Sequence, residues 1–94
     1  MGATLKIYEI TTQEVGNRRK ITLLEVANVW NSELIEEIKE NMYNHWHISS
    51  ECGAEFELQG HEILEFAEEI KKYDKDFKDN EIDIDEDYRC ILSY

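Results

Sequence analysis

The stretch AEFELQGHEILEFAEEI, residues 54–70, carries the clearest structural pattern in the chain. In its first half apolar and polar residues alternate, which predicts a strand over residues 54–59 with one buried face and one solvent-facing face. Gly60 interrupts this alternation. Apolar residues then recur at intervals of three and four, which predicts an amphipathic helix over residues 62–73. The stretch therefore predicts a strand followed at once by a helix.

Four further segments show comparable patterns. Residues 4–15 and 18–29 are rich in β-branched and aromatic residues, and Gly16-Asn17 between them predicts a hairpin turn. Apolar residues at helical spacing predict a helix over residues 33–46, with Asn31 or Ser32 as its N-cap. Alternation over residues 88–94 predicts a final strand, which Ile82 and Ile84 either extend or precede as a separate short strand.

Two details of these segments bear on the sheet. Ile21 and Leu23 have one parity in the second strand, while Leu24 and Val26 have the other. Apolar residues on both faces predict a central strand or a β-bulge. Trp46 falls on the apolar side of the expected first helix, which predicts a place in the core.

The predicted order is strand, strand, helix, strand, helix, strand. A chain of 94 residues with this order predicts a single small α+β domain spanning residues 1–94. We expect a two-layer sandwich with a roughly four-stranded mixed sheet and both helices on one face. The other face of the sheet is then open to solvent, and Glu55 and Glu57 are expected to lie on it.

Acidic residues dominate the charge of the chain. Twenty-two Asp and Glu stand against ten Lys and Arg, for a formal net charge of −12. Nineteen of the acids lie in residues 33–94, against six bases. Concentrated like charge weakens the compact state, and a positively charged partner relieves that repulsion. The balance argues against direct binding to nucleic acid or to an anionic membrane, because phosphate binding needs clustered Lys and Arg.

Two acidic regions are the candidate surface for such a partner. The outer face of the first helix repeats Glu at intervals of four, which places like charges next to each other. Residues 74–87 hold eight acids against two lysines, more than solubility requires. The candidate partner-binding residues are Glu36, Glu37, Glu40, Asp74, Asp76, Asp79, Glu81, Asp83, Asp85, Glu86 and Asp87.

The expected location of the protein follows from features that the sequence does not contain. Its apolar runs are two or three residues long, too short for a membrane span, and its first residues do not read as a signal peptide. Two cysteines, Cys52 and Cys90, are too few for a disulfide scaffold. We therefore expect a cytoplasmic protein with free thiols.

Two patterns in the sequence resemble parts of metal-binding sites. His45-Trp46-His47 with Cys52 contains zinc ligands, but a second ligand pair at short spacing is missing, and histidines at a helix C-terminus also suit the helix dipole. Residues 83–87 resemble the start of a calcium loop, but Tyr88 and Tyr94 stand where such a loop needs Gly and Glu. The prediction is no metal and no cofactor, with the roles of His45, His47 and Cys52 left open.

The sequence contains no catalytic motif. Cys52 with a nearby histidine lacks the flanking residues of a nucleophile elbow or a cysteine protease. A 94-residue two-layer domain rarely encloses the pocket that catalysis needs. We therefore expect a protein that is not an enzyme.

In size, α+β build, absence of proline and acid-rich segments 33–40, 55–69 and 74–87, the chain resembles two groups of small acidic inhibitors. These are the phage anti-CRISPR and DNA-mimic proteins and the bacterial immunity proteins that neutralise nuclease toxins. The resemblance implies a stoichiometric inhibitor without a cofactor that binds a nuclease or another nucleic-acid-binding effector. Two alternatives stay open: an adaptor or self-assembly domain that uses the open sheet face, and a small metal-binding domain.

Overall fold

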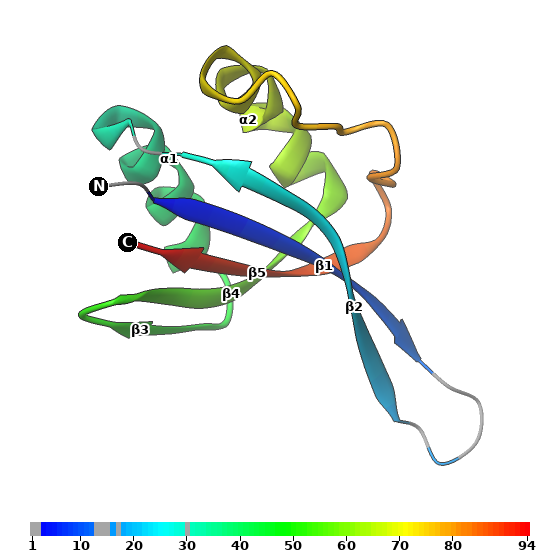
Figure 1. Ribbon diagram of the computed structural model, residues 1–94. Helices are drawn as coiled ribbons and strands as arrows, with labels where there is room; N and C mark the ends of the chain where they lie inside the picture. The colour runs from blue at the N-terminus through cyan, green and yellow to red at the C-terminus, as the bar shows by residue number, and fades with distance from the viewer. Residues whose placement is uncertain (1–2, 13–15, 17, 30) are drawn as a thin grey trace.

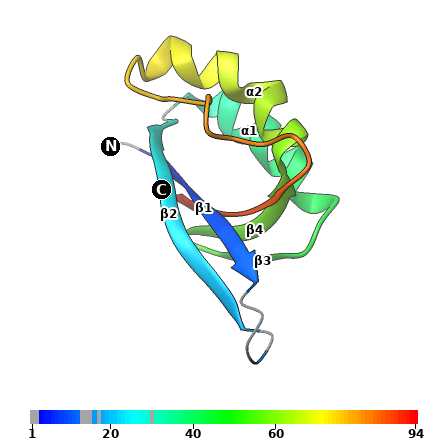
Figure 2. The ribbon, with the colours of Figure 1, turned by 90° about the vertical axis from the view of Figure 1, so that its right-hand side faces the viewer.

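Five strands and two helices form two layers in the computed structural model, which describes residues 3–12, 16, 18–29 and 31–94 (Figure 1). The sheet is one layer, and both helices cover the same face of it (Figure 2). In chain order the elements are β1 (Thr4–Thr12), β2 (Arg19–Asn28), α1 (Ser32–Tyr43), β3 (His47–Ser50), β4 (Gly53–Gln59), α2 (Gly60–Tyr73) and β5 (Asp87–Ser93). The expected α+β class and the placement of both helices on one face are confirmed.

The sheet has the strand order β2-β1-β5-β4-β3, and every neighbouring pair is antiparallel. The expectation of four strands in a mixed sheet is therefore wrong in both details. After α2, residues 74–86 carry the chain back to the end of the sheet where β4 finished. As a result β5 starts beside the last residue of β4, with Asp87 paired to Gln59, and runs antiparallel to it.

The expected helix over residues 33–46 ends at Tyr43 instead, and the fifth strand, β3, forms in the connection that was expected between residues 46 and 54. Helix α1 stops at Tyr43, because the Asn44 N–H bonds back to the carbonyls of Asn41 and Met42. The carbonyl of Trp46 then accepts a hydrogen bond from the Glu57 N–H at 3.3 Å, which starts the pairing of β3 with β4. Trp46 is 49% exposed, so the expectation that it belongs to the core is wrong.

Strand β2 lies at an edge of the sheet rather than in its centre. The register of β2 against β1 shifts between Ile7 and Tyr8, so the expected β-bulge is confirmed. The shift explains the mixed parity of β2, because Leu23 and Val26 then face the same side of the sheet. Gly16 has a φ of 82°, which suits a turn, while its expected partner Asn17 lies outside the described residues.

The core fills the space between the sheet and the helices. The predicted alternation of β4 is confirmed, since its Ala54, Phe56 and Leu58 are buried while Glu55 and Glu57 face the other side. Strand β5 adds a matching buried set that includes Tyr88. The helices contribute their predicted apolar faces, namely Leu34, Ile38 and Met42 from α1 and Ile63, Phe66, Ala67 and Ile70 from α2.

Candidate functional site

Residues 74–87 are held against the body of the protein, although they contain no helix and no strand before Asp87. Phe77 and Ile82 are buried in the core as anchors. The Tyr88 hydroxyl accepts a hydrogen bond from the Asp83 N–H at 2.7 Å. Gly60 approaches this backbone so closely that a Cβ at position 60 would overlap the Asp83 carbonyl. The segment therefore presents its side chains from a fixed backbone.

Three of its eight acids serve the local structure. Asp74 accepts hydrogen bonds from the backbone N–H groups of Asn28 and Asp76, at 2.9 and 3.0 Å. Asp79 forms an ion pair with Lys71 at 2.9 Å. Asp83 accepts a hydrogen bond from the Asp85 N–H at 2.9 Å. These carboxylates are partly or wholly committed to shaping the segment.

The other five acids of the segment are exposed, and their carboxylates take part in no ion pair or hydrogen bond with the residues the structure describes. They are therefore available to a partner as charged groups on a rigid backbone. These five are Asp76, Glu81, Asp85, Glu86 and Asp87.

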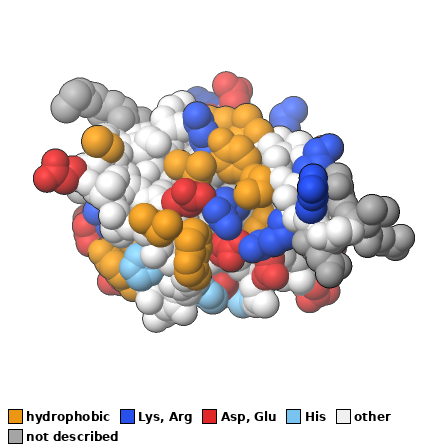
Figure 3. Space-filling model, turned by 90° about the horizontal axis from the view of Figure 1, so that it is seen from below, with side chains coloured by type: hydrophobic (Ala, Val, Ile, Leu, Met, Phe, Trp, Pro, Cys, Tyr) orange, Lys and Arg blue, Asp and Glu red, His pale blue; other side chains and the backbone are white. Residues whose placement is uncertain are grey.

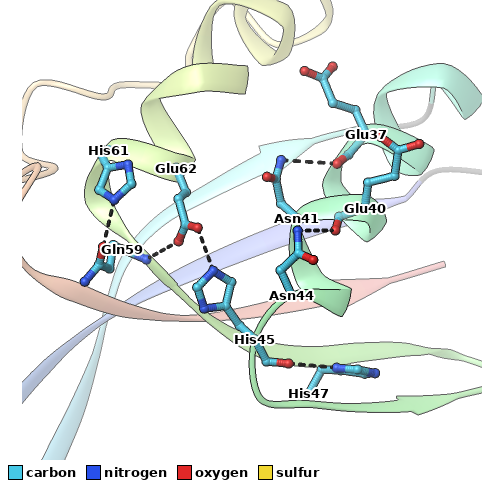
Figure 4. A network of polar contacts seen from close by, with 9 residues as sticks. All are labelled: Glu37, Glu40, Asn41, Asn44, His45, His47, Gln59, His61 and Glu62. Atoms are coloured by element: carbon cyan, nitrogen blue, oxygen red, sulfur yellow. Dashed lines mark hydrogen bonds and ion pairs between the residues drawn. The ribbon is translucent and has the colours of Figure 1, made fainter.

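The expected second patch, Glu36, Glu37 and Glu40, lies exposed on α1. The backbone carbonyls of Glu37 and Glu40 accept hydrogen bonds from the side chains of Asn41 and Asn44, both at 3.3 Å, and their carboxylates extend away from those bonds (Figure 4). Helix α2 lies between α1 and the 74–87 segment (Figures 1 and 2). The two expected patches are therefore not adjacent.

Helix α2 connects the two patches with acids that the sequence analysis did not select. Glu65 and Glu68 are exposed, opposite the buried face of the helix, and Glu69 pairs with Lys72 at 2.9 Å. The helical period of the sequence predicts that these acids are exposed, because residues at these positions must face away from Ile63 and Phe66. We call α1, α2 and residues 74–87 together the acidic layer; it holds sixteen acids and five bases.

The histidines have partners within the chain. His45 Nε2 lies 2.6 Å from Glu62, which also accepts the Gln59 N–H at 2.9 Å (Figure 4). Burial alone raises the pKa of Glu62, but these two hydrogen bonds outweigh it and hold that pKa below its usual value. His47 bonds to the backbone carbonyl of His45 at 2.9 Å, and His61 bonds to the Gln59 side chain at 2.7 Å.

Metal ligands do not converge in the described part of the chain, where no group of three or more His, Cys, Asp or Glu side chains is arranged to hold an ion. Cys52 is exposed and Cys90 is buried, and both are free thiols. Burial raises the pKa of the Cys90 thiol far above its usual value, which keeps that thiol protonated and unreactive.

The open face of the sheet differs sharply from the acidic layer (Figure 3). Hydrophobic side chains of β2 and β3 lie exposed on it, with Leu23 50%, Ile48 58% and Val26 40% accessible. Its central charge is Arg89, which forms ion pairs with Glu55 and Glu57 and stacks at 4.8 Å on the Trp46 ring. Lys and Arg gather toward the β1–β2 hairpin.

Arg89 and its neighbours neutralise each other across this face. Burial opposes the charged form of Arg89, but its hydrogen bonds to Glu55 and Glu57 raise its pKa. Burial likewise opposes the charged form of Glu57, and hydrogen bonds from Arg19 and Arg89 lower its pKa. The face is therefore an apolar surface crossed by a compensated ionic strip.

Comparisons with known proteins add nothing to this geometry, because no family model, no curated protein and no solved structure matches the chain. In the described residues, no helix has the length and apolar character needed to cross a membrane.

Proposed function

We propose that this protein is a non-enzymatic inhibitor, which binds a basic surface of a nucleic-acid-handling protein through its acidic layer. The partner is a nuclease or another nucleic-acid-binding effector in the same cytoplasm, and the carboxylates occupy the cleft that otherwise binds phosphates. The observation that carries the proposal is the set of five exposed, unpaired carboxylates on the anchored 74–87 segment.

Rigidity matters to this proposal. Charged groups on a fixed backbone lose little conformational entropy on binding, so more of their attraction to a cationic cleft remains as affinity. The uncompensated field also steers a basic partner and raises its association rate by roughly 10- to 1,000-fold. The acids of α1 and α2 extend the same field over the remainder of the layer.

The test removes charge from the segment without changing its shape. The triple variant Asp85→Asn, Glu86→Gln, Asp87→Asn leaves the structural carboxylates of Asp74, Asp79 and Asp83 in place. The wild-type protein is titrated against purified nucleases and nucleic-acid-binding effectors of the source cell, each bound to a labelled DNA duplex, and displacement is followed by fluorescence anisotropy. We expect stoichiometric displacement, and association about tenfold slower for the variant, most of all at low salt.

A charge-matched control makes this comparison specific. The variant Glu9→Gln, Glu14→Gln, Glu51→Gln loses the same formal charge from positions outside the acidic layer, and it should inhibit as the wild type does. Equal inhibition by all three proteins at every salt concentration would show that the 74–87 acids only keep the protein soluble.

A further inference from the structure

The strand register arranges the open face in rows that cross the sheet. One row, read from β2 to β3, is Val26, Lys6, Ile91, Glu55 and Ile48. The next row is Leu23, Tyr8, Arg89 and Glu57, and it ends beside Trp46, whose carbonyl binds the Glu57 N–H. In both rows β5 supplies the middle residue, and an apolar residue stands at each end.

When a second copy presents the same row in the opposite direction, the apolar residues at the two ends of the row face each other. A two-fold axis that runs along β5 in the plane of the open face places β2 of one copy over β3 of the other, and β1 over β4. Val26 then faces Ile48, Leu23 faces Trp46, and Tyr8 faces Glu57. Ile91 and Arg89 each face their own equivalent, and each Arg89 keeps its ion pairs with Glu55 and Glu57 of its own chain. Lys6, which has no ion pair with any described residue of its own chain, faces Glu55 of the second copy. A two-fold axis across the strands instead sets Lys6 against Tyr8 and Glu55 against Glu57, so Lys6 then gains no carboxylate partner.

The distribution of charge also favours the open face as the contact surface between two copies. A pair of molecules that each carry a formal charge of −12 repels strongly at most orientations. Apart from Asp87, which has the parity of Arg89 in β5, the acidic layer covers the opposite side of the sheet. Contact through the open face therefore keeps the helices and residues 74–86 of the two copies on the outside and farthest apart (Figure 2). The ionic strip of the open face is already compensated within each chain.

The area is also sufficient. Five strands at about 4.8 Å spacing, each with about seven residues at about 3.3 Å rise, give a flat footprint of about 550 Å². Protruding side chains and the extended β1–β2 hairpin enlarge the accessible area beyond that footprint (Figure 1). Two such faces bury about 1,100 Å² in total, which is above the roughly 1,000 Å² that a specific interface needs. We therefore infer that the open face is the interface of a symmetric homodimer, in which two sheets pack face to face about an axis along β5.

Two variants that reverse the charge at position 6 and at position 55 test this geometry, first alone and then mixed. Lys6→Glu sets two carboxylates against each other at both symmetric contacts, and Glu55→Lys sets two ammonium groups against each other. Each variant alone should dimerise about tenfold more weakly or worse than the wild type. In an equimolar mixture, the two substituted positions meet with opposite charges at one contact, and the other contact keeps the native Lys6–Glu55 pair. The mixture should therefore dimerise like the wild type.

The readout is sedimentation velocity at concentrations up to about 100 µM, which detects weak dimers. Circular dichroism confirms that each variant is folded, and restoration by mixing cannot arise from two misfolded chains. Leu23→Lys, at an exposed position, gives a second disruption that does not touch Arg89. Glu36→Lys repeats the charge change of Glu55→Lys within the acidic layer and should leave the dimer intact.

Each outcome of these experiments either supports the inferred dimer or overturns it. A monomeric wild type over the whole range overturns the inference, and so do single variants that dimerise normally, since these point to another surface such as the β2 edge. A mixture that stays monomeric overturns the proposed axis. No partner enters the experiment, so its result is independent of the proposed inhibitory function.

Discussion

At the scale of single residues, Glu62 joins two parts of the fold that are far apart in the sequence. It accepts the backbone N–H of Gln59, which opens helix α2, and it pairs with His45 in the link between α1 and β3. Its position three residues after the N-cap is readable from the sequence, because acids there satisfy free N–H groups. The contact with His45 is not readable, since it depends on where α1 ends.

Replacing Glu62 tests this double role. We expect Glu62→Ala to lower the free energy of unfolding at neutral pH by about 1 kcal/mol, the usual cost of a lost helix cap. The pKa of Glu62 is lower in the folded protein than its ordinary value of 4.5. Its contribution is therefore fully present above that value and disappears as the pH falls below it, through the folded pKa.

The measurement is urea unfolding followed by circular dichroism across this pH range. The difference between wild type and Glu62→Ala should shrink as the pH falls. Glu65→Ala, at an exposed position of the same helix, controls for the change to alanine. A difference that stays constant with pH would show that the carboxylate charge has no part in the cap.

At the scale of elements, the sequence correctly predicted the segments in which apolar residues recur with a regular period. Strand β4 and helix α2 have regular patterns, and both formed as expected apart from their ends. Strand β3 has only four residues, His47–Ser50, without a clear alternation of apolar and polar residues. It forms because β4 offers a free edge for pairing, which is a tertiary cause that no local pattern reveals.

Gly60 connects the elements of the candidate site, since α2 begins there against the backbone of the acidic segment. Its N–H donates to the Glu86 carbonyl at 2.8 Å. We expect Gly60→Ala to lower stability by about 1–3 kcal/mol, because the added methyl group meets backbone atoms that cannot rotate away. For a domain of this size, that corresponds to roughly 4–8 °C in Tm for each kcal/mol.

Thermal unfolding measures the cost, and amide exchange locates it. Protection should fall most at Gly60, His61 and Ile82, whose N–H groups hold or brace the segment. Glu68→Ala, which changes an exposed residue of α2, should leave both observables near the wild type. A Gly60→Ala protein with unchanged Tm would mean that the segment can move away without loss and is not firmly anchored.

At the scale of the whole molecule, the separation of charge follows from the fold. The sequence shows that acids crowd residues 33–94, and this predicted a directional field. It does not show that the acids of both helices and of residues 74–86 share one side of the sheet, while Asp87 starts β5 with the parity of Arg89. The acids of β4 lie within the same acidic stretch of sequence, but they are on the open face and paired with Arg89.

Self-repulsion within the acidic layer should make stability depend on salt. The Debye length falls from about 30 Å at 0.01 M to about 8 Å at 0.15 M ionic strength, so added salt screens repulsion across the layer. We expect Tm to rise over this range, measured at low protein concentration where the monomer dominates. The opposite is expected of a complex with a basic partner, whose attraction salt weakens.

Helix α1 provides the matched variant for this prediction. Its exposed pairs Glu33/Glu37 and Glu36/Glu40 each repel at a spacing of four residues, by about 0.2–0.5 kcal/mol. The double variant Glu36→Gln, Glu37→Gln removes both pairs, so it should unfold at a higher temperature than the wild type in low salt and show a smaller rise with added salt. A Tm that is flat with salt in the wild type would mean that the five bases of the layer already compensate its sixteen acids. The acidic layer would then hold no stored repulsion for a cationic partner to relieve, and its affinity would have to come from direct contacts alone.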